Sequence, residues 1–369
     1  MEHSLEDVLP LVDRLIIMHS GEILRDGPTC EILAQGDIPH VFKRPDLLRL
    51  ADELKLPGQP LSPEDFASSL AKMYGLRKIQ ITPDRHKNSP ARGPVIEIEN
   101  VSFNYVKDRD ALKNVSLTIQ AGELVAILGR NGSGKTTLVR HVIGLHQPAQ
   151  GKVRVLGRDV AQTPTHILAQ DVGFCFQNPN HQIVSFNVRD EMTFGLKAHS
   201  IDPSEYQSRI HEALEIVDMV NYMDTEVFDL GKGQKQRLAL ASVLTLKPQI
   251  LVIDEPTTGQ DPEMIDGIFE IIKRLNETGT TILLVTHRID YAAMFAQRAV
   301  VLKQGEVSYD RPILDLLGDL KTMQENSLIL PEISKLSLRL KDYGIPTGTV
   351  AYSAMKAYLD QIIEAPNGH

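Results

Sequence analysis

The chain has 369 residues, of which 42% are hydrophobic and 24% charged, and a formal net charge of −9. This composition is typical of a soluble globular protein, and the acidic balance argues against a general nucleic-acid-binding surface. No apolar run approaches the roughly 18 residues of a membrane-spanning helix, and the N-terminus lacks the basic and apolar regions of a signal peptide. Two cysteines cannot form a disulfide framework, and Cys175 is expected in the core. These features favour the cytoplasm.

Residues 14–27 have the pattern of a β-hairpin whose turn is Ser20-Gly21. The same pattern returns at 298–311, and the two passages align without a gap at a constant offset of 284 residues. Matching residues in this alignment are His3 and His287, Arg14 and Arg298, Gly21 and Gly305, Asp26 and Asp310, and Pro28 and Pro312. Two unrelated hairpins would share the turn but not the ungapped register. Residues 1–75 are therefore predicted to be the C-terminal remnant of a domain whose front part is missing.

Two further segments differ in character from the domains beside them. Residues 76–94 contain five lysines and arginines and three prolines, which predicts a basic, extended linker. A solvated linker is the simpler interpretation, and contact with lipid headgroups is the alternative. Residues 320–369 are predicted to form a helical extension, because apolar residues recur at helical spacing around 332–340.

The stretch 129–137, Gly-Arg-Asn-Gly-Ser-Gly-Lys-Thr-Thr, fits the phosphate-binding pattern G-x-x-x-x-G-K-[ST]. It lies between the apolar runs 124–128 and 138–145, as expected for a loop between a strand and a helix. Such a loop directs backbone N–H groups and a helix N-terminus towards phosphate, and its glycines allow the sharp turn. Lys135 would reach the β- and γ-phosphates, and the Thr136 hydroxyl would ligate Mg²⁺. The predicted ATP-binding residues of the loop are Gly129, Asn131, Gly132, Ser133, Gly134, Lys135, Thr136 and Thr137.

Apolar strands alternate with amphipathic helices in this part of the chain, which predicts a mostly parallel sheet. The sequence predicts buried strands at 172–176, 250–254 and 281–286, and a helix that begins at Asp261-Pro262. In such sheets ligands bind at the carboxyl ends of the strands. Polar residues follow or end the three strands, namely Gln177, Asp254 with Glu255, and His287. We expect these side chains to converge beside the phosphate loop.

The polar strand ends carry the predicted chemistry. Asp254 would hold Mg²⁺, and Glu255 would polarise water as general base. His287 would hydrogen-bond the γ-phosphate and the attacking water, and Gln177 would contact both metal and γ-phosphate. Each residue alone has an ordinary structural explanation, but their order on one sheet favours ATP hydrolysis. Tyr105 is predicted to stack on adenine, with core packing at a strand end as the alternative.

Residues 95–319 resemble an ABC-type ATPase domain. The motifs that carry the resemblance are the Walker A loop at 129–137, the Q-loop at Gln177, the Walker B strand with Asp254-Glu255, the D-loop at 259–261, the H-loop at His287 and the A-loop at Tyr105. The resemblance implies an α/β fold of the P-loop NTPase class, with a mostly parallel sheet, an antiparallel β subdomain and a helical subdomain at about 178–245. It also implies ATP and Mg²⁺ as cofactors.

The stretch from Phe176 to Gln182, with Phe186, 189–191 and 194–195, further resembles the ATPase subunits of energy-coupling factor transporters. The resemblance implies uptake of vitamins or metal ions through a membrane-embedded subunit that contacts the region after Gln177. A second ABC ATPase domain, either in a homodimer or on a separate ATPase subunit, would be the other partner. Nucleic acid is not expected, and the chain would lie peripherally at the cytoplasmic face of the membrane. Tails such as 320–369 assist ATPase dimerisation in this family, although packing on its own domain is an equal alternative.

The family's Leu-Ser-Gly-Gly-Gln signature is altered here to Leu-Gly-Lys-Gly-Gln at residues 230–234. The serine hydroxyl is absent, and Lys232 occupies the position of the first glycine. Lys232 would either supply charge to a partner's γ-phosphate or point into solvent. We therefore expect this domain to pair head-to-tail with a different ATPase domain, which gives two unequal sites.

Other members of the superfamily fit less well. A translation-type protein needs two complete domains, and a DNA-repair ATPase needs a coiled-coil insertion between Lys135 and Asp254 that the sequence has no room for. The remnant at 1–75 resembles the end of a first ABC domain but has no Walker motif, so its His3 has no predicted role. The remaining alternative is a non-catalytic remnant of a tandem ATPase that binds ATP without turnover.

Overall fold

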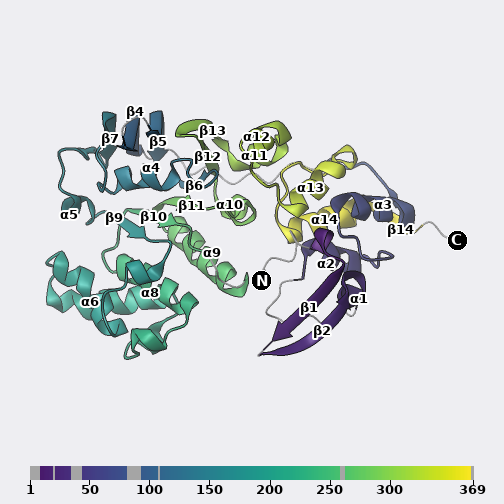
Figure 1. The fold of residues 1–369 in the computed structure, drawn as a ribbon, viewed down its shortest axis with the longest axis horizontal. Helices are drawn as coiled ribbons and strands as arrows, with labels where there is room; N and C mark the ends of the chain where they lie inside the picture. The colour runs from purple at the N-terminus through teal and green to yellow at the C-terminus, as the bar shows by residue number, and fades with distance from the viewer. Residues whose placement is uncertain are drawn as a thin grey trace. The chain divides into compact units, whose positions relative to one another are not determined.

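The computed structural model describes residues 9–19, 21–34, 44–80, 93–106, 109–257 and 262–366 (Figure 1). These residues form two compact units. The first unit takes the described residues within Met1–Arg85, Leu314–Leu320 and Ile329–His369, and the second takes those within His86–Ile313 and Lys321–Leu328. In the described part of the chain, no helix is both long enough and apolar enough to cross a membrane.

A six-stranded sheet with the order β13-β12-β6-β11-β10-β9 forms the centre of the second unit. Its strands run parallel except β13, which pairs antiparallel with β12. All residues of β6, β10 and β11 are buried, because the strands of a parallel sheet covered on both faces must be apolar throughout. The strand bounds are β6 Leu124–Leu128, β9 Val172–Cys175, β10 Ile250–Asp254, β11 Thr281–Val285, β12 Arg298–Lys303 and β13 Glu306–Pro312. The expected mostly parallel sheet is confirmed.

An antiparallel sheet with the order β5-β4-β7-β8 packs on the same core. Its strands are β4 Pro94–Val106, β5 Arg109–Gln120, β7 Gln150–Val155 and β8 Arg158–Asp159. Apolar and polar residues alternate at 96–98 and again at 101–105, which predicts two strands, but the structure has the one continuous strand β4. Asn100 adopts a left-handed φ of 51°, and the pairing with β5 shifts register between Ile98 and Val101. This bulge interrupts the apolar alternation without ending the strand.

Helices α6, α7 and α8 pack against one another and form the helical subdomain. Figure 1 shows α6 and α8 on one side of the six-stranded sheet and β4, β5 and β7 on the other. Helix α7 ends at Ile216, although the apolar pattern continues to Val220, because Asp218 has a left-handed φ of 56°. The helices of this unit are α4 Lys135–Val142, α5 Thr165–Leu168, α6 Val188–Ala198, α7 Tyr206–Ile216, α8 Lys232–Leu244, α9 Pro262–Glu277, α10 Ile289–Phe295 and α12 Leu320–Glu325, with α11 Ile313–Gly318 at the unit boundary. Short 3₁₀ turns lie at Pro179–His181, Pro203–Glu205, Val220–Tyr222 and Val227–Asp229.

Cys175 lies in the core of the second unit, as expected. Its residue is 1% exposed, and burial raises the pKa of the thiol to about 12. A thiol with so high a pKa carries almost no thiolate at neutral pH and is a poor nucleophile. The cysteine therefore acts as a small apolar residue of β9.

The first unit contains two sets of elements in the same order, and each set has two helices followed by a short strand. The first set is α2 Asp46–Glu53, α3 Pro63–Met73 and β3 Tyr74–Leu76, and the second is α13 Glu332–Arg339, α14 Tyr352–Ile362 and β14 Ile363–Pro366, with a 3₁₀ turn at Lys341–Tyr343. Strand β3 pairs antiparallel with β14, and α13 packs on both α2 and α3. A further part of the unit comprises the 3₁₀ turn Leu9–Leu11, β1 Arg14–His19, β2 Glu22–Pro28 and α1 Thr29–Ala34.

One apolar core joins the two sets of helices. Leu47, Leu50 and Phe66 from the first set pack in one cluster with Leu336 and Leu359 from the second. The sequence places 1–75 and 320–369 in separate parts, whereas in the structure they share this core. The start of the predicted linker packs against this core through Leu76 and Ile79, and Arg77 Nε donates to the Gln361 carbonyl at 2.7 Å. The rest of the linker, 81–92, lies outside the described residues.

Candidate functional site

The phosphate loop joins the end of β6 to the start of α4 and depends on glycine geometry. Gly129 and Gly134 have φ of 139° and 108°, values that disfavour every other residue. A Cβ at Gly129 would lie 2.3 Å from the carbonyl oxygen of Leu302, and one at Gly134 would lie 2.6 Å from that of Ala111. Both glycines are therefore required by the turn itself and by the close approach of neighbouring backbone.

Lys135, the first residue of α4, is buried and folds its side chain back over the loop. Its Nζ donates to the carbonyl oxygens of Gly129 at 2.8 Å and Arg130 at 3.1 Å. Burial lowers the pKa of the Lys135 ammonium, while the nearby carboxylates of Glu255 and Asp254 act in the opposite direction. The Lys135 ammonium is thus held beside two carboxylates, and a bound phosphate would accept a further hydrogen bond from it.

Two buried polar atoms beside Lys135 have no hydrogen-bond partner among the described residues. They are Ser133 Oγ and Asp254 Oδ1. Leaving a buried polar atom unpaired costs about 1–3 kcal/mol, so such atoms indicate a site that is completed by a ligand. The other carboxylate oxygen, Asp254 Oδ2, accepts a hydrogen bond of 3.2 Å from Thr136 Oγ1. Burial raises the pKa of Asp254, the Thr136 bond lowers it, and Glu255 adds a smaller upward effect.

Thr136 and Asp254 together fit a magnesium ion that is bound jointly with phosphates. In the described part of the chain, no cluster of three or more His, Cys, Asp or Glu side chains could hold a metal ion. Magnesium keeps several water or phosphate oxygens and takes one or two protein ligands, which a hydroxyl and a carboxylate can supply. Asp254 Oδ1, buried and unpartnered, is the oxygen best placed for this role.

Glu255 and His287 form a close pair at the ends of β10 and β11. Glu255 has a left-handed φ of 48°, and its backbone N–H donates to the Val285 carbonyl at 2.8 Å. Its Oε2 lies 2.6 Å from His287 Nδ1 and also accepts the His287 backbone N–H at 3.3 Å. The hydrogen bond to Glu255 raises the pKa of His287, while burial lowers it to a smaller extent. Glu255, the predicted general base, is thus hydrogen-bonded to His287, the residue that is predicted to contact the γ-phosphate.

Replacement of Glu255 by Gln is expected to lower the pKa of His287. The wild-type pKa lies above the ordinary 6.5, so the pair's contribution to stability is complete below pH 6.5 and is lost as pH rises through the raised value. In Glu255→Gln the charge partner is gone while burial, Arg288 and Lys135 still oppose protonation, so the pKa of His287 falls below its wild-type value. NMR titration of the imidazole measures it, and Glu270→Gln on α9 is the control. An unchanged pKa would contradict the pairing.

The strand order brings the predicted strand-end residues next to one another. The loop follows β6, His287 follows β11, Asp254 ends β10 and Gln177 follows β9, and these four strands are neighbours in the sheet. Gln177 is exposed at this edge. The predicted D-loop, 259–261, lies outside the described residues, and α9 begins directly after it at Pro262.

Tyr105, near the end of β4, lies beside the phosphate loop with 54% of its residue surface exposed. Its hydroxyl is 3.2 Å from Thr137 Oγ1 and 3.0 Å from His146 Nε2. Phe103 contacts the Tyr105 ring edge-on and stacks on His146, with centroids 5.1 and 5.0 Å apart. The Tyr105 ring is therefore held in place by its neighbours but remains exposed, which favours stacking on adenine over the alternative of core packing.

His146 is a component of the site that the sequence analysis does not single out. Burial, followed by the charge of Arg140, lowers the pKa of His146, which favours the neutral imidazole. A neutral imidazole can donate a hydrogen bond to the Tyr105 hydroxyl or accept one from it, and it places no positive charge beside the predicted adenine position. The only sequence signal is its place just after the apolar run that ends at Leu145, which does not distinguish it from other surface histidines.

The altered signature lies at the start of α8. The Gly231 N–H donates to Gln234 Oε1 at 2.8 Å, and Lys232 is exposed at the first position of the helix. Gly233 is buried, and a Cβ there would lie 2.4 Å from Met264 Sδ of α9. Gly233 thus serves packing between α8 and α9, and residues 231–232 are the part of the signature that faces solvent.

The mostly parallel sheet, the glycine loop between β6 and α4 and the carboxylate that ends β10 define a P-loop nucleotide-binding protein. A family model described as "ABC transporter" matches residues 112–258. The solved ATP-binding cassette MJ0796, seen as a dimer with ADP and Pi, is 30% identical, and the match covers 59% of this chain and 98% of that one, with a TM-score of 0.54. The chain therefore belongs to the family of ABC transporter ATP-binding proteins.

Further relatives extend the match beyond the cassette. The solved cbiO1 of Clostridium perfringens, part of the ABC transporter complex cbiONQ, is 29% identical over 68% of this chain and 97% of its own, with a TM-score of 0.59. Proteins of Methanosarcina mazei and Caldanaerobacter subterraneus, with the provisional name ABC transporter ATP-binding protein, are 33% and 34% identical over 97% and 92% of this chain. The chain spans 64% and 61% of their lengths.

Proposed function

We propose that the chain is the ATP-binding and ATP-hydrolysing subunit of an ABC-type uptake transporter of the energy-coupling factor class, which takes up a vitamin or a metal ion. The observation that carries the catalytic part is the Glu255–His287 pair, which lies at the strand ends beside Lys135 and Asp254. A non-catalytic remnant would have no need of a base in this position. The likeness to cbiO1, a part of the complex cbiONQ, supports the transporter class.

The proposed mechanism is transfer of the γ-phosphoryl group of ATP to water. The N–H groups of the phosphate loop and Lys135 would bind the phosphates, and the Tyr105 ring would support the adenine. Thr136 and Asp254 would hold Mg²⁺, which when bound neutralises charge on the β- and γ-phosphates. Glu255 would take the proton from the attacking water as the bond between the γ-phosphorus and the β–γ bridging oxygen breaks.

His287 would act as the switch between the resting and the hydrolytic arrangement. In the structure its Nδ1 lies against Glu255 Oε2, so this carboxylate oxygen is already engaged by the imidazole. Rotation of the His287 side chain towards a γ-phosphate would free the oxygen to accept a proton from water. The 60% exposure of the His287 side chain leaves room for such a movement.

The membrane-embedded partner would bind the segment after Gln177. Apolar side chains are exposed there, with Val184 at 61%, Phe186 at 79% and Phe194 at 57%. Glu191 fixes this segment, because its buried Oε2 accepts the N–H groups of Val184 and Ser185 at 3.0 Å each. Met192, which the region after Gln177 also includes, is fully buried and belongs to the core of the helical subdomain.

Replacement of Phe186 by Asp is expected to release the chain from its membrane partner. The change places a charge in the centre of the exposed apolar segment while the folded domain loses little, since 79% of Phe186 is exposed. Membrane fractionation of cells that produce the tagged protein measures the effect. The control is Ile329→Asp, at a residue that is 68% exposed elsewhere in the chain. A wild-type distribution of Phe186→Asp would contradict the proposed docking segment.

The second proposed partner is another ABC ATPase domain, bound head-to-tail. The altered residues 231–232 face solvent, where a partner's nucleotide would lie, and no hydroxyl is present there. Size measurement of Glu255→Gln with and without Mg-ATP tests the pairing, because blocked hydrolysis should trap a closed dimer. We expect a monomer under both conditions and a complex when an ATPase domain with an unaltered signature is added. A homodimer formed with Mg-ATP alone would contradict the need for a different domain.

Residues 1–75 form part of this proposal as the C-terminal part of a first ABC domain. The hairpin of β1 and β2 and the helix α1 begin and end at positions that match β12, β13 and α11 at the offset seen in the sequence. The 95–319 domain would be the complete copy, and 320–369 would be its helical extension. Helices α13 and α14 of this extension share a core with α2 and α3 of the first copy. The proposed location is the cytoplasmic face of the membrane, through the partner subunit.

A further inference from the structure

Arg288 places a positive charge directly beside the proposed catalytic pair. It follows His287 in the chain and is the N-cap residue of α10. Glu255 Oε2 accepts the backbone N–H of His287 at 3.3 Å, and consecutive Cα atoms are only about 3.8 Å apart. An extended arginine side chain spans more than one residue of backbone, so the Arg288 guanidinium can reach this carboxylate. Guanidinium and carboxylate groups form strong two-bond pairs. Glu255 is therefore an alternative partner of Arg288.

In the structure, the guanidinium of Arg288 binds a different carboxylate, that of Asp290. Arg288 Nε lies 3.0 Å from Asp290 Oδ1 and Nη2 lies 2.6 Å from Oδ2, which is the two-bond geometry. Asp290 belongs to the first turn of α10. Both side chains are partly exposed, at 33% and 37%. Removal of the Asp290 charge would therefore release the guanidinium without opening the core.

The ring of Tyr291 supports the same guanidinium. Arg288 Cζ lies 4.6 Å from the ring centroid, which is a cation–π contact. The tyrosine is buried and stacks on Phe269 of α9, with the ring centroids 4.7 Å apart. Its hydroxyl donates to Asp266 Oδ1, also on α9. Burial, followed by this hydrogen bond, raises the pKa of Tyr291, so the hydroxyl keeps its proton. Helix α9 therefore fixes the ring on which the guanidinium rests.

The pKa of His287 depends on the charges around its imidazole. The hydrogen bond to Glu255 raises this pKa, and burial lowers it to a smaller extent. The charges of Arg288 and Lys135 lower it further. Arg288 thus acts on the imidazole even while its guanidinium is bound to Asp290. In contact with Glu255, the guanidinium would occupy a carboxylate oxygen that His287 or the attacking water needs.

We propose that Asp290 and Tyr291 are positioning residues for the general base, because together they hold the Arg288 guanidinium away from Glu255. They contact neither nucleotide nor attacking water and act only through Arg288. With the guanidinium held at Asp290, Glu255 Oε2 remains paired with His287 at 2.6 Å. The proposal rests on the proposed ATPase function and adds to it a reason for the charged and aromatic side chains at the start of α10.

The first test is loss and rescue of turnover. Asp290→Asn releases the guanidinium to Glu255, so we expect kcat to fall by about tenfold or more, a part of the roughly 10²–10⁴-fold that a general base contributes. Arg288→Gln alone should keep the wild-type kcat. The double variant Arg288→Gln/Asp290→Asn has no guanidinium left to bind Glu255, so its kcat should return to the wild-type value. Steady-state phosphate release measures all three. A loss that persists in the double variant would overturn the proposal.

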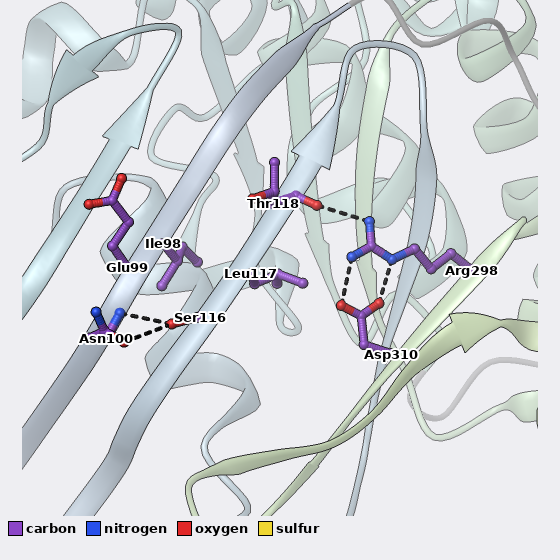
Figure 2. Close-up of a pocket in the computed structure, with 8 residues that line it drawn as sticks. All are labelled: Ile98, Glu99, Asn100, Ser116, Leu117, Thr118, Arg298 and Asp310. Carbon is purple, nitrogen blue, oxygen red and sulfur yellow. Dashed lines mark hydrogen bonds and ion pairs between the residues drawn. The ribbon is translucent and has the colours of Figure 1, made fainter.

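Asp310→Asn is the matched control for the loss of an ion pair. Figure 2 shows Asp310 bound to Arg298 with the same two-bond geometry, at 2.5 and 2.7 Å. Arg298 lies opposite Val125 near the start of β6, whereas the phosphate loop follows the end of that strand. The control thus removes an equivalent pair at the opposite end of the strands. We expect its kcat to equal that of the wild type, and a loss as large as in Asp290→Asn would overturn the proposal.

The contribution of Tyr291 is tested by a pair of substitutions. Tyr291→Phe keeps the aromatic face for Arg288 and loses only the hydrogen bond to Asp266, so kcat should stay close to the wild-type value. Tyr291→Leu removes the aromatic face, and we expect a loss of kcat that is smaller than in Asp290→Asn and is reversed by Arg288→Gln. A loss that Arg288→Gln does not reverse would show that Tyr291 acts through packing alone and would overturn its part in the proposal.

The pKa of His287 separates this proposal from the ATPase function, because NMR titration of the imidazole needs no turnover. With the guanidinium at Glu255, His287 loses its hydrogen-bond partner and gains a closer positive charge. Its pKa should therefore fall in Asp290→Asn and recover in the double variant. An unchanged pKa in Asp290→Asn would overturn the proposal even if the chain hydrolyses ATP. A pKa that falls and recovers in a chain without ATPase activity would support the role of Asp290 and count only against the proposed function.

Discussion

Glu255→Gln should retain ATP binding and lose ATP hydrolysis by a factor of about 10²–10⁴, the usual contribution of a positioned general base. The amide keeps the size of the side chain and can still hydrogen-bond the His287 backbone N–H that now lies 3.3 Å from Oε2. It cannot take a proton from water. Steady-state phosphate release measures turnover, and equilibrium binding of a fluorescent ATP analogue measures affinity.

The control for this variant is Glu270→Gln, which removes a carboxylate from the exposed side of α9. It should leave both turnover and affinity at the wild-type values. Turnover by Glu255→Gln at the wild-type rate would show that another group accepts the proton. A loss of affinity as large as the loss of turnover would show that Glu255 acts in nucleotide binding rather than in the chemical step.

Gly134→Ala should weaken ATP binding by about a hundredfold or more, equivalent to roughly 2.7 kcal/mol. The φ of 108° is strained for alanine, and the added Cβ would lie 2.6 Å from the carbonyl oxygen of Ala111. Because that oxygen is backbone, the loop has to move, and the N–H groups that would bind phosphate move with it. Titration calorimetry with ATP measures the loss.

Gly157→Ala is the matched control, because Gly157 has a similarly left-handed φ of 76° and no atom within 4 Å of the added Cβ. This variant carries the backbone strain without the collision and lies outside the phosphate loop. We expect it to lower the free energy of unfolding by about 1 kcal/mol and to leave ATP affinity unchanged. Wild-type affinity in Gly134→Ala would contradict the description of the loop.

The sequence predicts the candidate site because local rules determine its parts. The pattern at 129–137 requires a strand before it and a helix after it, and both are present as β6 and α4. Asp254 and His287 are found together because strands that run parallel end at one edge of the sheet. This arrangement can be predicted without knowing which distant segments of the chain contact one another.

Other features depend on contacts that no local pattern contains. The shared core of the first unit joins Leu50 to Leu336, residues far apart in the chain, and the antiparallel pairing of β3 with β14 follows from that packing. His146 acquires its contact with Tyr105 through the fold, because β4 and the end of α4 lie side by side. The continuous β4 was missed since the bulge at Asn100 breaks the alternation on which strand prediction rests.

The two copies of the hairpin show how a repeat in the sequence becomes informative once exposure is known. Ile16 and Val300 occupy matching positions, yet one is 49% exposed and the other fully buried. Sequence alone predicts the same structure for both, and that prediction is consistent with the hairpins themselves. The two hairpins differ in their neighbours, because β12 also pairs with β6 whereas β1 pairs only with β2 within the described residues. Only the structure shows this difference.

The structure of Glu255→Gln with bound Mg-ATP would show directly where the nucleotide binds. We expect the triphosphate along residues 129–137, the adenine against the Tyr105 ring, and Thr136 with Asp254 at the metal ion. Lys135 Nζ should leave the carbonyl oxygens of Gly129 and Arg130 and contact the phosphates. A nucleotide bound elsewhere, or a loop without nucleotide at saturating Mg-ATP, would contradict it.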